Sequence, residues 1–251
     1  MSAPAAPDGR VPRYLGAAFL AVFVTSLVSG VLSGSVLVGS ISEVLADISD
    51  SVAQMRASTV LQLLTSVGIV VLASLLYAVL RDQNRIVALV ALGWWLAETV
   101  VLALSTLGTY ALTPLSLEYV KAGTPASSYY QTLGTLFLAL DQNAYAIHML
   151  FFCLGAVLWY YLLFRSRVVP RALSVWGLLA VSLVLVNTLL IIWDRSLDLG
   201  TALYVAYVPF ELVVGLWLLI KGARPASMVG VPANSVSRRS TWLAQQARCT
   251  S

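Results

Sequence analysis

Charge is what this sequence has least of. Only 10% of its 251 residues are charged, while 59% are hydrophobic, and an ordinary soluble domain carries about a quarter charged residues. This excludes a typical soluble domain, because most of the apolar surface would have to face lipid. The net charge of +4 could suggest nucleic acid as a partner. However, the basic residues stand in short clusters between apolar runs, as membrane flanks do, so we expect no nucleic-acid binding.

Cysteine and histidine are almost as scarce. Cys153 lies inside an apolar run and Cys249 lies in the polar C-terminal tail, so a disulfide between them is not expected. His148 is the single histidine, and the clustered ligand spacing of a metal site is missing. The sequence also lacks a glycine-rich phosphate loop and an HExxH motif. We therefore expect no metal and no cofactor.

Long apolar runs dominate what is present. A helix needs about 20 apolar residues to cross the hydrocarbon core of a membrane, and helices satisfy their own backbone groups there. The runs predict an all-α, polytopic helical bundle with the lipid bilayer as its surroundings. The six predicted spans are residues 14–38, 59–80, 86–112, 141–164, 172–193 and 201–220. Residues 127–140 either continue the fourth span or precede it.

The Lys and Arg residues near the span ends set the expected orientation. Nine fall on one side, and three (Arg56, Lys121 and Arg195) fall on the other. Cytoplasmic loops are the ones enriched in Lys and Arg. The pattern thus predicts a multi-pass protein of the cell (plasma) membrane with both termini in the cytoplasm. Residues 1–13 would form an N-terminal tail, residues 14–222 the membrane domain, and residues 223–251 a disordered tail.

Two outer connections are longer than a turn requires. In Ile41–Met55 the apolar residues recur at helical spacing, with acidic residues on the other faces. This predicts an amphipathic helix on the outer surface, between spans one and two. Residues 115–130 include Gly123-Thr124-Pro125 and predict a short helix followed by a turn.

Polar side chains at membrane depth are the candidate site. Glu98 lies about 19 Å beyond Arg85, and Glu211 about 15 Å before Lys221, at 1.5 Å per helical residue. Polar groups at such depth usually face the bundle interior or a wet cavity. We therefore predict an outward-opening polar pocket. Its expected lining is Glu98, Asp141, Tyr145, His148, Asn187, Tyr207 and Glu211.

Whether Glu98 and Glu211 are charged or neutral decides between a ligand site and a purely structural role. No Lys or Arg lies inside a predicted span, so the carboxyls must be protonated, paired with His148, or neutralised by a bound cation or amine. The alternative is that they are neutral groups that hydrogen-bond neighbouring helices. Replacing both by Gln would separate these cases.

Small residues repeat along the first span. Ser26, Gly30 and Gly34 follow one another at four-residue intervals, beside Ser29 and Ser33. Such spacing lets helices pack closely. It therefore predicts a helix contact, either within the bundle or with a partner or second copy of the chain.

Two stretches resemble a bacterial membrane family known as domain of unknown function 4386. They are Leu162–Gly177, which contains Arg-Ser-Arg-Val-Val-Pro-Arg, and Glu211–Gly222. The resemblance covers roughly Arg13 to Gly222 and implies a compact helical bundle without assigning an activity. Glu98 and Glu211 fall where the family often has acids. Before Ala144-Tyr145 the family leads us to expect a histidine, and this sequence has Asn143.

Three functions remain open from the sequence. The first is binding or transport of a small cation, amine or lipid headgroup in the outward-facing cavity. The second is an accessory subunit that docks to a membrane partner through the outer amphipathic helix and the small-residue face of the first span. The third is an intramembrane hydrolase with Ser33 as nucleophile and His148 as base.

Overall fold

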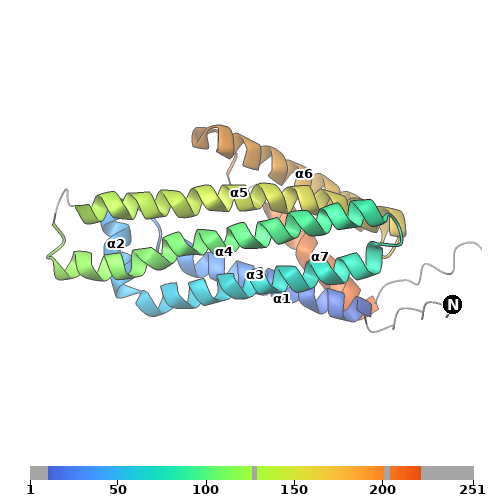
Figure 1. Ribbon diagram of the computed structural model, residues 1–251, viewed down its shortest axis with the longest axis horizontal. Helices are drawn as coiled ribbons and strands as arrows, with labels where there is room; N and C mark the ends of the chain where they lie inside the picture. Colours follow the sequence, from blue (N-terminus) through green and yellow to red (C-terminus); the bar gives the residue numbers. More distant parts are fainter. Residues whose placement is uncertain (1–10, 126–128, 201–203, 222–251) are drawn as a thin grey trace, which may run out of the picture.

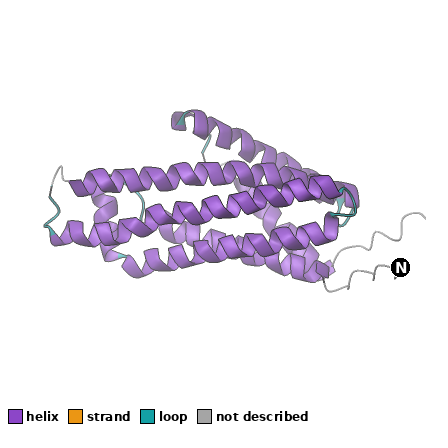
Figure 2. Ribbon diagram, in the orientation of Figure 1, coloured by secondary structure: helices purple, strands orange, loops and turns teal. Residues whose placement is uncertain are grey.

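The computed structural model describes residues 11–125, 129–200 and 204–221, with side chains at 11, 12, 204 and 205 left out. These residues form α-helices, one 3₁₀ helix and turns (Figures 1 and 2). The helices are α1 (Val11–Gly34), α2 (Ile41–Asp50), α3 (Val52–Leu80), α4 (Arg85–Lys121), α5 (Tyr129–Ser166), α6 (Arg171–Trp193) and α7 (Tyr204–Lys221), with η1 (Arg195–Leu197) between α6 and α7. The described residues leave out most of the predicted N-terminal tail and the whole predicted C-terminal tail, which contains Cys249. They also leave out Thr201, where the sixth span was predicted to start.

Five helices are long and apolar enough to cross a membrane: α1, α3, α4, α5 and α6. This agrees with a multi-pass membrane protein and with five of the six predicted spans. α7 has 18 residues, about 27 Å at the helical rise. Cys153 is buried and is a free cysteine among the described residues.

Six of the helices pack around a ring, which α7 completes toward the basic end. The packed pairs are α1 with α3, α3 with α4, α4 with α5, α5 with α6, α6 with α7, and α7 with α1. One end of the ring holds the connections rich in Lys and Arg, among them the loop that starts at Arg81 and the one that starts at Arg167; we call it the basic end. The other end holds α2 and the turn 122–125, and we call it the cap end. Figure 1 shows α6 diverging from the α4–α5 pair toward its C-terminus.

The basic half of the bundle carries the main hydrophobic core. Trp159, Tyr160 and Leu76 are fully buried there. Glycines allow the helices to approach closely, because a Cβ at Gly16 of α1 would overlap the backbone of Leu219 in α7. Gly215 of α7 is likewise buried against the side chain of Leu20 in α1.

The cap is a second, smaller core. α2 begins at a capping box in which Ser40 and Glu43 bond reciprocally. The N–H and hydroxyl of Ser40 hold the pKa of Glu43 below its ordinary value. Val44, Leu45 and Ile48 of α2 are fully buried, against α4 and α5.

The structure corrects the predicted helix over Ile41–Met55 in two ways. The helix breaks at Ser51, and Met55 belongs to α3, which begins at Val52 rather than at Thr59. The apolar face of α2 does not lie on the membrane surface, because the extensions of α4 and α5 cover it. The same extensions correct the third span, which was predicted to end at Leu112.

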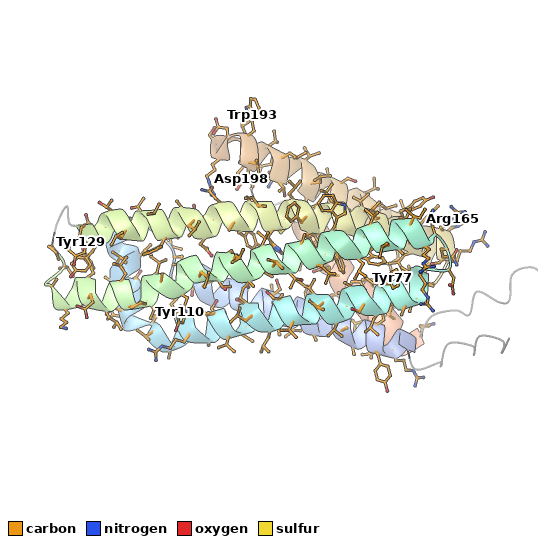
Figure 3. All side chains as sticks on the ribbon, in the orientation of Figure 1. Tyr77, Tyr110, Tyr129, Arg165, Trp193 and Asp198 are labelled. Atoms are coloured by element: carbon orange, nitrogen blue, oxygen red, sulfur yellow. The ribbon has the colours of Figure 1, made fainter. Side chains whose placement is uncertain are left out.

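α4 continues through Pro114 to Lys121. A proline inside a helix removes one backbone hydrogen bond and usually kinks or ends the helix. Here the lost bond is offset by tertiary contacts: Leu112 and Tyr119 are buried in the cap core, and the Ser116 hydroxyl donates to the Leu45 carbonyl. α5 is likewise continuous from Tyr129, so residues 129–140 extend the fourth span. Figure 3 shows Tyr129 at the cap end and Arg165 at the basic end of this helix.

Candidate functional site

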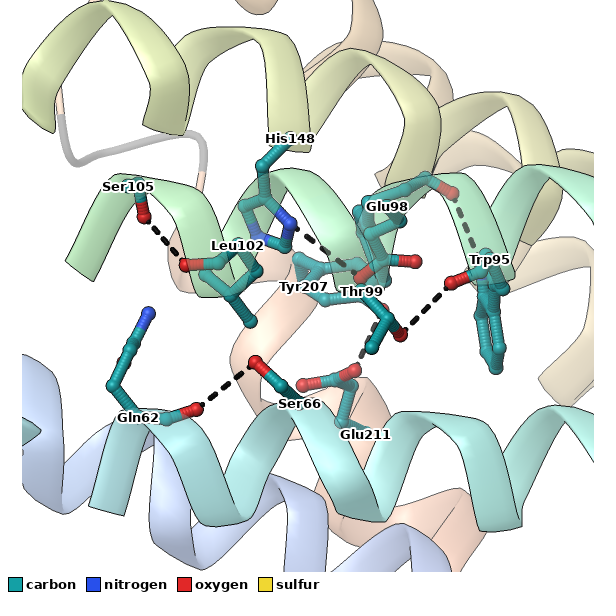
Figure 4. Close-up of polar contacts among 11 residues, drawn as sticks. Gln62, Ser66, Trp95, Glu98, Thr99, Leu102, Ser105, His148, Tyr207 and Glu211 are labelled. Carbon is teal, nitrogen blue, oxygen red and sulfur yellow. Dashed lines mark hydrogen bonds and ion pairs between the residues drawn. The ribbon is translucent and has the colours of Figure 1, made fainter. Parts of the chain in front are cut away.

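Three helices bring the predicted polar residues together inside the ring. Glu98 comes from α4, His148 from α5, and Tyr207 and Glu211 from α7 (Figure 4). Glu98 stands on the buried face of α4, one turn from Trp95 and one turn from Leu102. It is only 1% exposed, and His148 is 7% exposed. The helical spacing thus turns both groups inward, as the sequence predicted.

Glu98 and His148 face each other without a complete set of hydrogen bonds. The Nδ1 atom of His148 lies 3.7 Å from Oε1 of Glu98, which is longer than a hydrogen bond. The buried atoms Oε2 of Glu98 and Nδ1 of His148 have no hydrogen-bond partner. Buried polar groups are rarely left unsatisfied, and an orphaned group often marks a functional site or an unseen water or ion.

Glu211 ends a short chain of hydroxyl groups. The Tyr207 hydroxyl donates to Oε1 of Glu211 at 2.7 Å. It also lies 2.8 Å from the buried hydroxyl of Tyr160. These hydrogen bonds orient one carboxyl oxygen of Glu211. The Glu211 side chain lines the same cavity as Glu98.

The inner cavity, which we define by the acids that line it, has a volume of about 340 Å³. Its polar lining includes Gln62, Glu98, His148, Tyr207 and Glu211, and its apolar lining includes Trp95, Phe152 and residues of α1. No Lys or Arg is among the described residues that line it. Two carboxyl groups therefore share a space in which no described side chain offsets a negative charge.

The outer cavity lies next to it, toward the cap, and has a volume of about 440 Å³. Hydroxyl groups from α1, α3 and α4 line it, together with Asp141 and Gln142 of α5. Asp141 accepts a hydrogen bond from Thr109 at 3.3 Å. Tyr145 lines both cavities and stacks obliquely on His148, with 5.2 Å between the ring centres.

Arg195 is the residue that sequence reasoning missed. It lines the outer cavity, and its guanidinium donates to the side-chain oxygens of Gln142 and Asn143 at 3.1 and 2.7 Å. The sequence does not indicate that η1 folds back onto α5. It therefore gives no signal that Arg195 lies at a cavity. Arg195 does not line the inner cavity, so the acids there remain without a fixed cation among the described residues.

Asn187 lies apart from the other predicted residues. Its side chain is fully buried, donates to Asp198 at 3.0 Å and accepts from the backbone N–H of Leu199 at 2.9 Å. Both polar atoms are thus used to fasten the segment after η1 to α6. Neither cavity includes Asn187 in its lining, so we leave it out of the site that we propose below.

The small-residue face of α1 lines the cavities. Ser26 and Gly30 border both of them, and a Cβ added at Gly30 or Gly34 would meet no atom within 4 Å. The close packing in this half of α1 is made instead by Ser29, whose hydroxyl donates to the carbonyl of Ser58 at 2.9 Å. A docking partner for the face remains a prediction.

The geometry of a hydrolase is missing from the described residues. Ser33 donates to the backbone carbonyl of Ser29 and borders the outer cavity, whereas His148 faces Glu98 in the inner cavity. A nucleophile needs its base within hydrogen-bond reach. A metal site is equally unsupported, since the part of the chain that the structure describes contains no group of three His, Cys, Asp or Glu side chains able to hold an ion.

Comparison with known proteins identifies the family without an activity. No curated protein matches this sequence. No solved structure matches it either. The family model described as "Domain of unknown function (DUF4386)" matches residues 14–222, which include every described helix except the first residues of α1. The chain, with its acid-lined helical bundle, therefore belongs to the DUF4386 family.

Proposed function

We propose that this chain is a six-span protein of the cell membrane that binds a small organic cation, with the ammonium group held between Glu98 and Glu211. In this proposal α7 is the sixth span, and its length of about 27 Å is close to the hydrocarbon thickness. The basic end faces the cytoplasm, because Lys and Arg gather there. The two cavities then lie on the outer side of the fully buried residues Leu76, Trp159 and Tyr160.

The observation that carries the proposal is the pair of carboxyls on one cavity without a described cation. Two like charges in a medium of low dielectric constant repel each other, so both cannot stay ionised unless something positive joins them. The unpartnered Oε2 of Glu98 marks a position where a donor is missing. A bound ammonium would supply both the charge and the hydrogen bond.

The rest of the lining favours an organic cation over a metal ion. Divalent metals prefer several oxygen ligands arranged around one point, and the described residues offer no such cluster. Trp95, Phe152 and Tyr207 place aromatic rings on the cavity, and aromatic rings attract alkylammonium groups. A volume of about 340 Å³ is within the range of small-molecule sites.

The test is equilibrium binding of propylammonium, which carries both the positive charge and N–H donors, to the full chain in lipid nanodiscs. Glu98→Gln and Glu211→Gln keep the side-chain shape and remove the charge, so each should weaken binding at least about tenfold, the loss expected when one charged contact is removed. Glu118→Gln is the matched control, because Glu118 lies on the same helix but is exposed beside Lys121 and should leave binding unchanged. Wild-type protein that does not bind the probe, or a Glu98→Gln variant that binds as wild type, would refute the proposal.

A further inference from the structure

The ring of helices has a gap on the cap side of the acids. Along the described residues α1 and α5 make no extended contact, although both line the two cavities. α7 lies between them only from Tyr204 onward and contacts α6 through Phe210 against Gly177, toward the basic end. The end of α6 and η1 border the outer cavity nearer the cap, through Thr188, Ile191 and Arg195. No residue of α6 or η1 lines the inner cavity, so no described residue of either helix separates α1 from α5 along it.

The rim of this gap is apolar and belongs to the outside of the bundle. Leu27 and Val31 line the inner cavity, yet they are 46% and 64% exposed. Across the gap, Tyr145 lines the same cavity and is 44% exposed. A side chain that borders a cavity and is also exposed stands where the cavity meets the surroundings. At this depth in a predicted span those surroundings are hydrocarbon, not water.

From this geometry we infer that the ligand of the inner cavity is a single-chain cationic amphiphile that reaches the acids sideways from the membrane. This inference rests on the proposed function and specifies its ligand class. The ammonium lies between Glu98 and Glu211, and the hydrocarbon chain leaves between α1 and α5, past Leu27 and Val31. The hydrocarbon chain of the ligand stays in lipid throughout. Only the ammonium head has to lose its water when it enters the protein.

Two features of the gap support this occupant over a purely water-soluble one. The rim offers apolar side chains where an aqueous pore would need polar ones, and the negative groups lie at the inner end of the path. An amphiphile carries the matching charge at one end and the matching apolar surface at the other. The outer cavity, lined by hydroxyls, gives a small hydrophilic cation a separate route to the same acids, through the residues that both cavities share.

The experiment compares two probes on variants that fill the gap. Propylammonium has a short hydrocarbon chain, and dodecylammonium has the same head with a long one. Leu27→Trp enlarges a side chain at the rim, and it should fold, because Leu27 is 46% exposed and lines the inner cavity but not the outer one. Val31→Trp is a second way to fill the rim. Val24→Trp is the matched control, because Val24 lies on the same helix, is 52% exposed and lies outside both cavities.

Binding is measured in lipid nanodiscs, with partition into empty discs subtracted. We expect Leu27→Trp and Val31→Trp to weaken binding of dodecylammonium at least tenfold and to change binding of propylammonium less than threefold. Val24→Trp should change neither. Equal losses for both probes, or unchanged binding of the long-chain probe in both rim variants, would overturn the lateral path. If wild-type protein binds neither probe, the proposed function itself fails, which is a different result from failure of the path alone.

Discussion

The two halves of α1 use the same small residues for opposite purposes. Near the basic end, Gly16 lies so close to α7 that a Cβ would overlap its backbone. Near the cap, Gly30 and Gly34 have nothing within 4 Å of an added Cβ, and Gly30 borders both cavities. The first half of α1 packs tightly against α7 (the sealed half), and the second half borders the cavities (the open half). Small residues in a membrane helix therefore indicate either contact or space, and only the neighbouring helix decides which.

The largest expected effect comes from filling the sealed half. Gly16→Leu forces α1 and α7 apart where their backbones meet, and overpacking of this kind costs typically 1–3 kcal/mol, with about 3 kcal/mol expected here because the obstacle is backbone. The measurement is the unfolding free energy in mixed micelles, with Gly34→Leu as the control. If the two variants were equally stable, the contrast between the halves of α1 would be lost.

A smaller effect is expected where the open half is still tied to α3. Ser29 and Ser58 exchange hydrogen bonds with each other's carbonyls at 2.9 and 3.0 Å. Hydrogen bonds between membrane helices contribute about 0.6 kcal/mol on average and at most about 1.7. A double-mutant cycle with Ser29→Ala and Ser58→Ala should give a coupling free energy in that range. A coupling indistinguishable from zero would show that these hydroxyls do not hold α1 against α3.

The smallest effect is expected from a methyl group in the open half. Gly30→Ala adds a side chain with room around it and removes a residue that disfavours helices by up to about 1 kcal/mol. Thermal unfolding should show a slightly more stable protein. Loss of stability instead would mean that another surface approaches Gly30, as in the predicted contact with a second copy of the chain.

Much of the fold could be predicted from the sequence, because lipid forces long apolar runs into helices. The errors fall where tertiary contacts override a local signal. The third span was predicted to end at Leu112, but α4 stays helical to Lys121, because Tyr119 packs into the cap and Ser116 bonds to α2 there. The break at Ser51 is equally hidden, because the apolar spacing continues from α2 into α3.

The candidate site was predicted in part, for the same kind of reason. Glu98, His148, Tyr207 and Glu211 meet because depth along a span and helical face are both readable from spacing. Asn187 satisfied the same criteria, but its partners, Asp198 and Leu199, lie beyond the end of its helix. Arg195 was assigned to an outer loop, and only the path of that loop over α5 brings it to a cavity.

The continuous α4–α5 pair has a mechanical consequence. These helices pack together from the cap to the basic end, with Tyr119 on Tyr130 at one end and Trp95 under Gly155 further along. Glu98 and His148 therefore lie on one packed helix pair that continues into the cap, while Glu211 belongs to α7, which packs on α1 and α6. A force applied to the cap would tilt α4 and α5 together. It would carry Glu98 toward or away from Glu211 while the gap between Glu98 and His148 stayed constant.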